Sequence, residues 1–302
     1  QLNGACARYL NYRAKYTKMP RALFAHGDSS LNIRNGRALE SERDKQIANA
    51  VFGNGSKDKE ELGDGVYRNF GIGKDGFNVS SCQFAIHYFF NDDKTLHSFL
   101  RNVSECTKVG GYFIGTCFDG QRVMEYLKDT PEGKDRTYTV GDYKAIAIRK
   151  EYTITEEDFE WTPDTEQSDT KTIANEPAML GKQISVFQET FGEYYPEYLV
   201  NFEYFKWKCA QYNLYPLESV HTTSDILDKD EYNKMLTLSM SNFSEFYKDY
   251  VFKNGTEMDE ELQELSFLNR IFIFKKVDDT PRQEYNITED YSDIKAVAMV
   301  GV

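Results

Sequence analysis

The stretch that most restricts how this chain can fold runs from residue 77 to residue 128. It opens with the apolar run FNVSSCQFAIHYFF, continues with DKTLHSFLRNVSECT, and then reads GGYFIGTC from Gly110. Periodicity predicts strands and helices in alternation: strands over 77–83 and 111–117, helices over 93–107 and 120–128. This order is typical of an α/β fold, in which a parallel sheet carries helices on both faces.

The rest of the chain adds elements to this frame. We expect helices over 5–16, 38–51, 196–213 and 231–248, and strands over 21–26, 143–153, 182–189, 214–222 and 269–276. Residues 31–75 otherwise form a polar loop. Its GIGKDG motif precedes a strand instead of following one, which favours a connection over a phosphate loop. We expect one domain over residues 1–276 and a C-terminal tail over 277–302.

Composition narrows the classes of function. The formal net charge is −13, and proteins that grip long nucleic acids through phosphates are usually basic, so only a local pocket for one or two nucleotides fits. No apolar stretch approaches the ~20 residues that span a bilayer. The five cysteines are scattered without a CxxC pair, which indicates neither a zinc site nor a disulfide framework. We therefore expect an intracellular, cytoplasmic protein away from membranes.

Polar and aromatic side chains follow three of the predicted strands. Gln83, Phe84, His87 and Tyr88 come after strand 77–83, HGDSS (26–30) follows another strand, and GTCFD (115–119) ends a third. Ligands of open α/β sheets bind at the carboxyl ends of the strands. The sequence therefore predicts a ligand site at that edge.

The combination of SCQFAIHY (81–88) with a downstream PEYLV (196–200) resembles the mRNA cap guanine-N7 methyltransferases, and the resemblance covers about residues 4–276. The segments GKQISVFQE and LSFLNRIFIFKK are similar to the C-terminal methyltransferase domain of the multifunctional capping enzymes of large DNA viruses. The resemblance implies a class I S-adenosylmethionine-dependent methyltransferase fold, Rossmann-like, with a mainly parallel seven-stranded sheet.

The resemblance also implies roles for individual residues. Asp28 and Ser29 match the pair that reads the adenine of S-adenosylmethionine, and Gln83 matches a cofactor contact near its methionine part. Phe84, His87 and Tyr88 match residues that line the cap guanine pocket, and Glu197 matches the acid that accepts the guanine N1 and N2 hydrogens. A carboxylate suits that edge because it only accepts, and guanine offers two adjacent donors there.

Methyl transfer to guanine N7 requires few catalytic groups from the protein. N7 has a lone pair and no proton to lose, and the sulfonium donor is already activated. We therefore expect no general base and no metal, and the site residues position the two reactants.

The chain departs from the family pattern in three places. No Gly-x-Gly turn precedes Asp28, so we expect an upstream segment of the parent chain, or another polypeptide, to complete the sheet. Asn269, with Phe267 nearby, stands where cellular members place a pocket tyrosine. Cys117-Phe118 follows strand 111–117 where a proline is usual.

The implied partners are the capped RNA 5′ end, upstream triphosphatase and guanylyltransferase domains of a viral parent chain, and an accessory subunit. Two other functions stay open. One is a non-catalytic methyltransferase-like subunit that stabilises a capping complex, and the other is a small-molecule methyltransferase.

Overall fold

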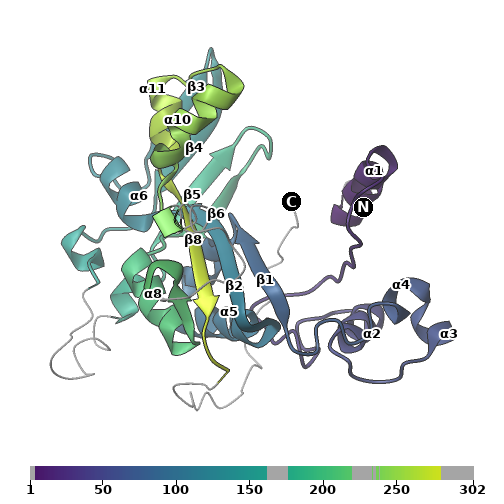
Figure 1. Cartoon of the computed structure of the whole chain (residues 1–302). Helices are drawn as coiled ribbons and strands as arrows, with labels where there is room; N and C mark the ends of the chain where they lie inside the picture. Colours follow the sequence, from purple (N-terminus) through teal and green to yellow (C-terminus); the bar gives the residue numbers. More distant parts are fainter. Residues whose placement is uncertain (1–3, 162–175, 220–232, 234–235, 238, 280–302) are drawn as a thin grey trace. The chain divides into compact units, whose positions relative to one another are not determined.

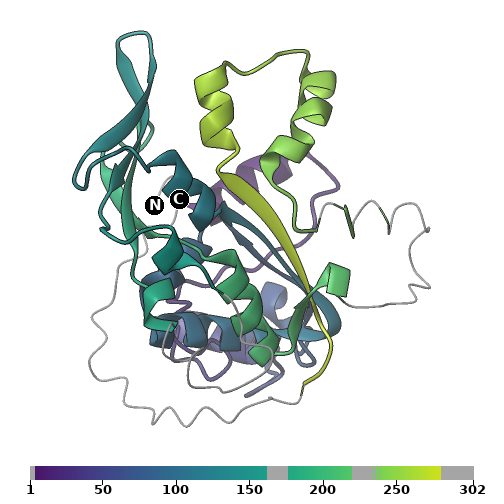
Figure 2. The same ribbon diagram turned by 90° about the vertical axis from the view of Figure 1, so that its left-hand side faces the viewer.

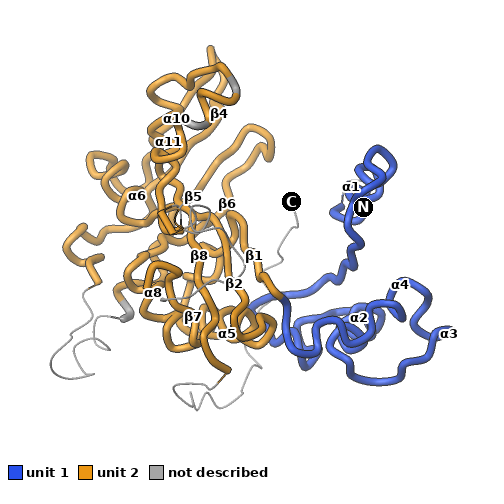
Figure 3. The backbone as a smooth tube through the Cα atoms, in the orientation of Figure 1, with its two compact units in different colours: residues 1–77, 283–302 blue, residues 78–282 orange. Residues whose placement is uncertain are grey.

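The computed structural model describes residues 4–161, 176–219, 233, 236–237 and 239–279 (Figure 1). The chain divides into two compact units. Unit 1 comprises residues 1–77 with 283–302, and unit 2 comprises residues 78–282 (Figure 3). Within the described ranges, no helix is both long and apolar enough to cross a membrane.

Unit 1 contains short helices. They are α1 (Ala5–Lys15), α2 (Glu42–Val51), α3 (Lys59–Leu62) and α4 (Asp64–Tyr67). Side chains fix two helix starts, because Ser41 accepts from the Asp44 N–H and Asp58 accepts from the Glu60 and Glu61 N–H groups. A small apolar cluster of Ala50, Leu62 and Val66 joins α2, α3 and α4. The helices predicted over 5–16 and 38–51 are confirmed.

The strand predicted over 21–26 is wrong. Among the residues that the structure describes, this segment joins neither sheet, and its side chains are exposed. The chain pairs only at the next residue, where Gly27 forms an isolated antiparallel bridge with Leu39. Apolar residues alone do not make a strand, because a strand needs a neighbour to satisfy its backbone groups.

The first sheet of unit 2 has the order β1-β2-β8-β7. Its strands are β1 (Phe77–Gln83), β2 (Thr107–Phe118), β7 (Leu214–Pro216) and β8 (Asn269–Lys276). β1 and β2 run in the same direction, since Ser80 Oγ lies 2.6 Å from Thr107 Oγ1 and Phe84 donates its N–H to the Thr116 carbonyl group. β8 is antiparallel to both β2 and β7.

Two helices cover one face of this sheet. They are α5 (Asp93–Cys106) and α8 (Phe202–Gln211), and both contribute to one apolar core with β2, β7 and β8. Phe113 of β2 and Phe274 of β8 are register partners on that face, and both are fully buried. The alternation of buried and partly exposed residues along β2 follows from this one-sided cover.

The second sheet has the order β3-β4-β5-β6, and every ladder in it is antiparallel. Its strands are β3 (Asp135–Val140), β4 (Tyr143–Lys150), β5 (Gln183–Gln188) and β6 (Tyr194–Tyr198). The β3–β4 hairpin projects from unit 2 in both views (Figure 1, Figure 2). Its apolar side packs on α6 (Gly120–Tyr126) and on residues of α11 (Glu260–Ser266).

The remaining elements of unit 2 are short or flank these sheets. They are the 3-10 helices η1 (Ile86–Asn91), η2 (Glu157–Phe159), η3 (Glu176–Met179) and η4 (Leu217–Ser219), and the helix α10 (Phe243–Asn254). The segment that precedes α10 lies along β8, because Ile271 and Ile273 donate their N–H groups to the Ser241 and Ser239 carbonyls.

The predicted α/β class is confirmed, but the predicted mainly parallel seven-stranded sheet does not match. The described strands form two sheets of four, and β1 with β2 is the parallel pair. Short turns account for two of the three antiparallel pairs in the second sheet, β3–β4 and β5–β6, whereas a long connection joins β4 to β5. Gly141 between β3 and β4 and Gly192 between β5 and β6 both have positive φ, and a tight turn can only reverse the chain.

The helix predicted over 196–213 begins later than expected. Residues 194–198 form strand β6, and α8 starts at Phe202 after the Asn201 side chain caps its first turn. Pro196 lies in β6 at the edge of the sheet, where a missing N–H is tolerated. Glu197 therefore lies on a strand and not in the first turn of a helix.

Candidate functional site

The candidate site is built on the turn that ends β1. Phe84 follows the strand with φ of 51°, a left-handed conformation that is uncommon outside glycine. This turn leads at once into η1, which places His87 and Tyr88 beside the end of the strand. The Phe84 side chain itself is 53% exposed. A strained backbone at the carboxyl end of a strand is typical of functional sites.

Gln83 is held at the end of β1 by two side-chain hydrogen bonds. Its Nε2 donates to Ser81 Oγ, and its Oε1 accepts from Thr116 Oγ1, each at 2.9 Å. β1 and β2 approach closely here, because a Cβ at Gly115 would lie 2.2 Å from the Cys82 carbonyl oxygen. The glycine thus allows Thr116 to reach Gln83 across the two strands.

Glu197 and His87 meet in the interior. Oε2 of Glu197 lies 3.4 Å from Nδ1 of His87, and the two side chains are 12% and 6% exposed. Glu197 Oε2 and His87 Nε2 are both buried without a hydrogen-bond partner among the described residues. Buried polar atoms are nearly always satisfied, so this pair has hydrogen-bonding capacity that a ligand could use.

Burial controls the ionisation of both groups. It lowers the pKa of His87 to about 3 and raises the pKa of Glu197 to about 8. Although the distance would allow an ion pair, the cost of removing both charges from water favours a neutral imidazole beside a protonated carboxyl group.

Tyrosine side chains lie beside this pair. The His87 and Tyr88 rings lie 4.2 Å apart at 70°. The pKa of Tyr88 is raised by burial and by the nearby Glu197 and Tyr195, which places both of these groups close to its hydroxyl. Tyr195 and Glu197 are two residues apart on β6, so their side chains share one face of the strand.

The structure therefore brings together His87, Tyr88 and Glu197, with Gln83 and Phe84 at the preceding strand end. Asp28 and Ser29 belong to unit 1. There Asp28 Oδ1 accepts from the N–H and the hydroxyl of Ser30, at 2.8 and 2.7 Å. Oδ2 of Asp28 accepts no hydrogen bond from any residue that the structure describes.

Two side chains at this site were not found from the sequence. One is Phe243, the first residue of α10, whose ring lies edge-to-face with Phe84 at 6.3 Å. The other is Tyr195. The alternation of YYPEY signals a strand that pairs Tyr195 with Glu197 on one face, but Pro196 hides the signal. Nothing local in the sequence links Phe243 to Phe84.

The residues that depart from the family pattern lie at the start of β8. Asn269 is the register partner of Phe118 and donates its side-chain amide to the Ser266 carbonyl group. Phe267 packs its ring on Tyr247 of α10 at 5.5 Å. Cys117 is fully buried. These residues are engaged in packing.

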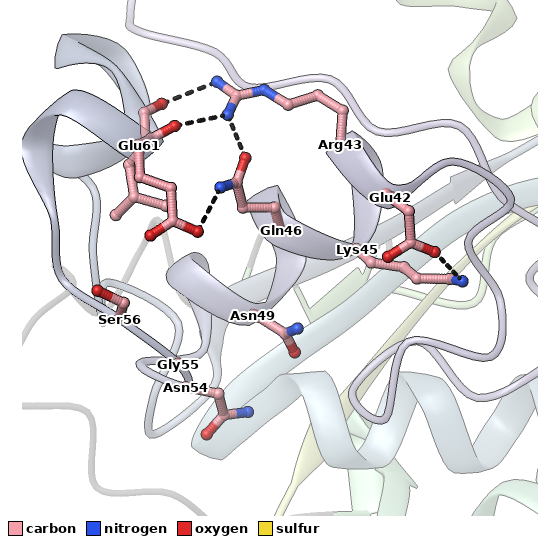
Figure 4. Close-up of a pocket in the computed structure, with 10 residues that line it drawn as sticks. Glu42, Arg43, Lys45, Gln46, Asn49, Asn54, Gly55, Ser56 and Glu61 are labelled. Carbon is pink, nitrogen blue, oxygen red and sulfur yellow. Dashed lines mark hydrogen bonds and ion pairs between the residues drawn. The ribbon is translucent and has the colours of Figure 1, made fainter.

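Unit 1 contains an open depression between α2 and the segment that follows it (Figure 4). Several of its polar groups pair within the depression: Arg43 donates to the Leu62 carbonyl group, Gln46 to Glu61, and Lys45 to Glu42. None of the predicted site residues lines it. In the described ranges, no group of three or more His, Cys, Asp or Glu side chains could hold a metal ion.

Comparison with known proteins points to one family. Residues 10–159 match the mRNA (guanine-N(7))-methyltransferase domain. Over these residues the chain is similar to that family. The matched range includes Asp28, Ser29 and the whole segment from Gln83 to Tyr88, whereas Glu197 lies beyond it.

Individual relatives agree. A Caenorhabditis briggsae mRNA cap guanine-N(7) methyltransferase is 43% identical over 61 residues, which are 20% of this chain and 16% of the relative. The Eremothecium gossypii enzyme of the same name is 25% identical over 67% of this chain and 43% of its own length. The Aspergillus clavatus enzyme is 30% identical over 47% of this chain and 27% of its own length. The chain thus spans less than half the length of these relatives.

One solved structure overlaps in part. It is a S-adenosylmethionine-dependent methyltransferase from Clostridium acetobutylicum, with a TM-score of 0.30, 14% identity, and coverage of 66% of this chain and 58% of that chain. This overlap is too low to carry any conclusion about the site.

Proposed function

We propose that this chain belongs to an enzyme that transfers a methyl group from S-adenosylmethionine to N7 of the guanosine cap of mRNA. The observation that carries the proposal is the buried Glu197–His87 pair, whose two orphaned polar atoms lie beside Tyr88. The family match over residues 10–159 supplies the reaction class.

The guanine pocket is formed by Phe84, His87, Tyr88 and Glu197. Glu197 accepts the N1 and N2 hydrogens of the base, which satisfies its orphaned Oε2. The aromatic rings of His87 and Tyr88 hold the purine plane. Since the base gains positive charge on methylation, nearby π faces and an acidic group favour the transition state.

The cofactor contacts are Asp28, Ser29 and Gln83. The chemistry of these groups suits the cofactor. Oδ1 of Asp28 fixes the turn, and its Oδ2 remains available to accept from the adenine amine. Thr116 and Ser81 hold the Gln83 amide in place. S-adenosylmethionine, when bound, supplies a methyl group already activated on a sulfonium. The protein orients the acceptor, and orientation can contribute ~7–11 kcal/mol.

The finer features of the proposal follow from the resemblance. They are a viral origin, binding of the capped RNA 5′ end, a location in the cytoplasm or viral factory, and partners in the form of upstream capping domains or an accessory subunit. The net charge of −13 argues against a long RNA track held through its phosphates and is compatible with a local pocket for the cap.

The test is methyl transfer by the full-length protein from labelled S-adenosylmethionine to GpppA-capped RNA. We expect Glu197→Ala to lower kcat/KM by at least about 100-fold, since a site built to pair a buried polar edge loses heavily when one partner is removed. Unchanged turnover in this variant contradicts the proposed pocket. Binding of neither S-adenosylhomocysteine nor GpppA by the unaltered protein points instead to a non-catalytic subunit.

A further inference from the structure

The environment of Glu197 provides little to stabilise a negative charge. The titratable groups that face it are His87 and Tyr88 from η1 and Tyr195 from its own strand, and β5 places the apolar Ile184 as its register partner. Across the described ranges, no lysine or arginine forms an ion pair with it. A carboxyl group buried among uncharged groups keeps its proton.

A protonated carboxyl group does not fit the guanine edge. The N1–H and N2–H groups are two donors side by side, whereas a carboxylic acid offers one acceptor and one O–H donor. One donor would face another, and a buried unpaired donor is costly. The base therefore fits only after the proton has left Glu197.

The neighbouring imidazole is a poor acceptor for that proton. His87 is 6% exposed, and an imidazolium ion there would lie next to a purine that becomes cationic during methylation. Like charges in a buried site repel strongly. Solvent is the remaining acceptor.

We propose that the guanine edge of the cap binds in exchange for one proton, which leaves the Glu197 carboxyl group for the solvent. This rests on the proposed function. The step balances as Glu197–COOH plus cap giving Glu197–COO⁻ with two N–H···O hydrogen bonds plus one H⁺ taken up by buffer. The pocket is thus a pH-dependent guanine receptor.

The sign of the dependence follows from linkage. Burial holds the pKa of Glu197 at about 8 in the free protein, and the bound carboxylate is stabilised by the two N–H donors. Below that pH, release of the proton to solvent becomes more favourable as the pH rises. Cap affinity therefore increases about tenfold per pH unit. Above it the affinity levels off.

The experiment is isothermal titration of the full-length protein, saturated with S-adenosylhomocysteine, with GpppA at pH 6.5 and pH 9. GpppA is chosen because it has no terminal phosphate that would itself titrate near neutral pH. Repeating each titration in phosphate, PIPES and imidazole at pH 6.5 separates the proton count from the binding enthalpy. We expect about one proton released per cap at pH 6.5, almost none at pH 9, and an affinity about 30-fold higher at pH 9 than at pH 6.5.

Two variants locate the proton. Glu197→Gln has no ionisable group, so any cap binding that it retains is expected to be weak, free of proton release and independent of pH. His87→Asn keeps the carboxyl group and is expected to release the proton still. Proton release that persists in Glu197→Gln overturns the assignment to Glu197. The same holds if His87→Asn still binds the cap but no longer releases a proton.

The unaltered protein separates this inference from the proposed function. Cap binding with no released proton and no change of affinity between pH 6.5 and pH 9 overturns the inference and leaves the proposed function standing. If the protein binds no cap at any pH, the proposed function is wrong, and the inference that rests on it fails with it.

Discussion

Nδ1 of His87 lies 3.4 Å from Oε2 of Glu197, yet burial leaves both groups uncharged. Ionisation of either group therefore destabilises the folded state: that of Glu197 at high pH, and that of His87 at low pH. The pKa of Glu197 is raised from 4.5 to about 8, so stability is lost as pH rises through that range. The pKa of His87 is lowered from 6.5 to about 3, so stability is lost as pH falls through that range.

Between pH 4.5 and 6.5 the two slopes cancel, and from pH 6.5 to pH 8 only Glu197 acts. At about 1.4 kcal/mol per pH unit, this interval costs about 2 kcal/mol of unfolding free energy. Urea unfolding at pH 6.5 and pH 8 measures the loss. In Glu197→Gln we expect the loss to shrink by that amount, and an equal loss in both proteins would mean that Glu197 is already ionised.

The turn at Phe84 gives a second prediction. Its φ of 51° is unfavourable for any side chain with a Cβ and costs about 1 kcal/mol. We therefore expect Phe84→Gly to be more stable than Phe84→Ala by about 1 kcal/mol in chemical unfolding, although both lose the ring contact with Phe243. Both variants should bind GpppA more weakly, because neither presents the ring.

Ala85 is the matched control for this comparison. Its φ of −142° is negative and so lies outside the left-handed region that favours glycine. Ala85→Gly should destabilise the protein by about 0.5–1 kcal/mol, the usual cost of added backbone freedom. If glycine increased stability relative to alanine at both position 84 and position 85, the effect would have a cause other than the left-handed turn.

The elements that the sequence predicted well are those with strong local patterns. β1, α5, β5 and β8 match the predicted ranges closely because their apolar periodicity agrees with the way they pack. Strand β3 was not predicted, because DRTYTV is polar and its pairing depends on the hairpin with β4. The helix predicted over 196–213 is wrong at residues 196–198, which lie in strand β6. Pro196 is tolerated there because β6 is an edge strand, which only the tertiary fold reveals.

The site was predictable in part. His87 and Tyr88 follow an apolar strand, and strand ends are where α/β ligands bind. Their meeting with Glu197 came from the family resemblance alone, since a contact between η1 and β6 depends on the tertiary fold. The neutral state of the pair depends on burial by residues far apart in the sequence, which no local pattern encodes.

Asp28 offers a prediction about the cofactor. Oδ1 fixes the turn through Ser30, so Asp28→Ala should lower both stability and the affinity for S-adenosylhomocysteine. Asp28→Asn is the sharper variant, because its amide oxygen can keep the turn while its NH₂ group replaces Oδ2 and faces the adenine amine. We expect unchanged unfolding free energy and at least about tenfold weaker binding by calorimetry, the effect of about 1.4 kcal/mol from an unpaired donor. Wild-type affinity in Asp28→Asn would restrict Asp28 to the turn.

Arg270 at the start of β8 gives the last prediction. Its guanidinium group donates to Asp119 Oδ2 at 2.8 Å and to the Met240 carbonyl at 2.7 Å, and it stacks on the Phe202 ring at 3.4 Å. The Arg270 and Asp119 side chains are 16% and 11% exposed. Arg270→Met leaves the Asp119 charge buried and unpaired, so we expect a loss of about 3–5 kcal/mol in urea unfolding.

The double variant Asp119→Asn with Arg270→Met separates the charge from the packing. Asparagine keeps an oxygen for the first turn of α6, where Asp119 Oδ1 accepts from the Gln121 and Arg122 N–H groups. Because no buried charge is then left alone, the double variant should be more stable than Arg270→Met by about 1–3 kcal/mol. Strictly additive losses in the double-mutant cycle would show that the guanidinium stabilises β8 through Phe202 and Met240, with Asp119 contributing only as a helix cap.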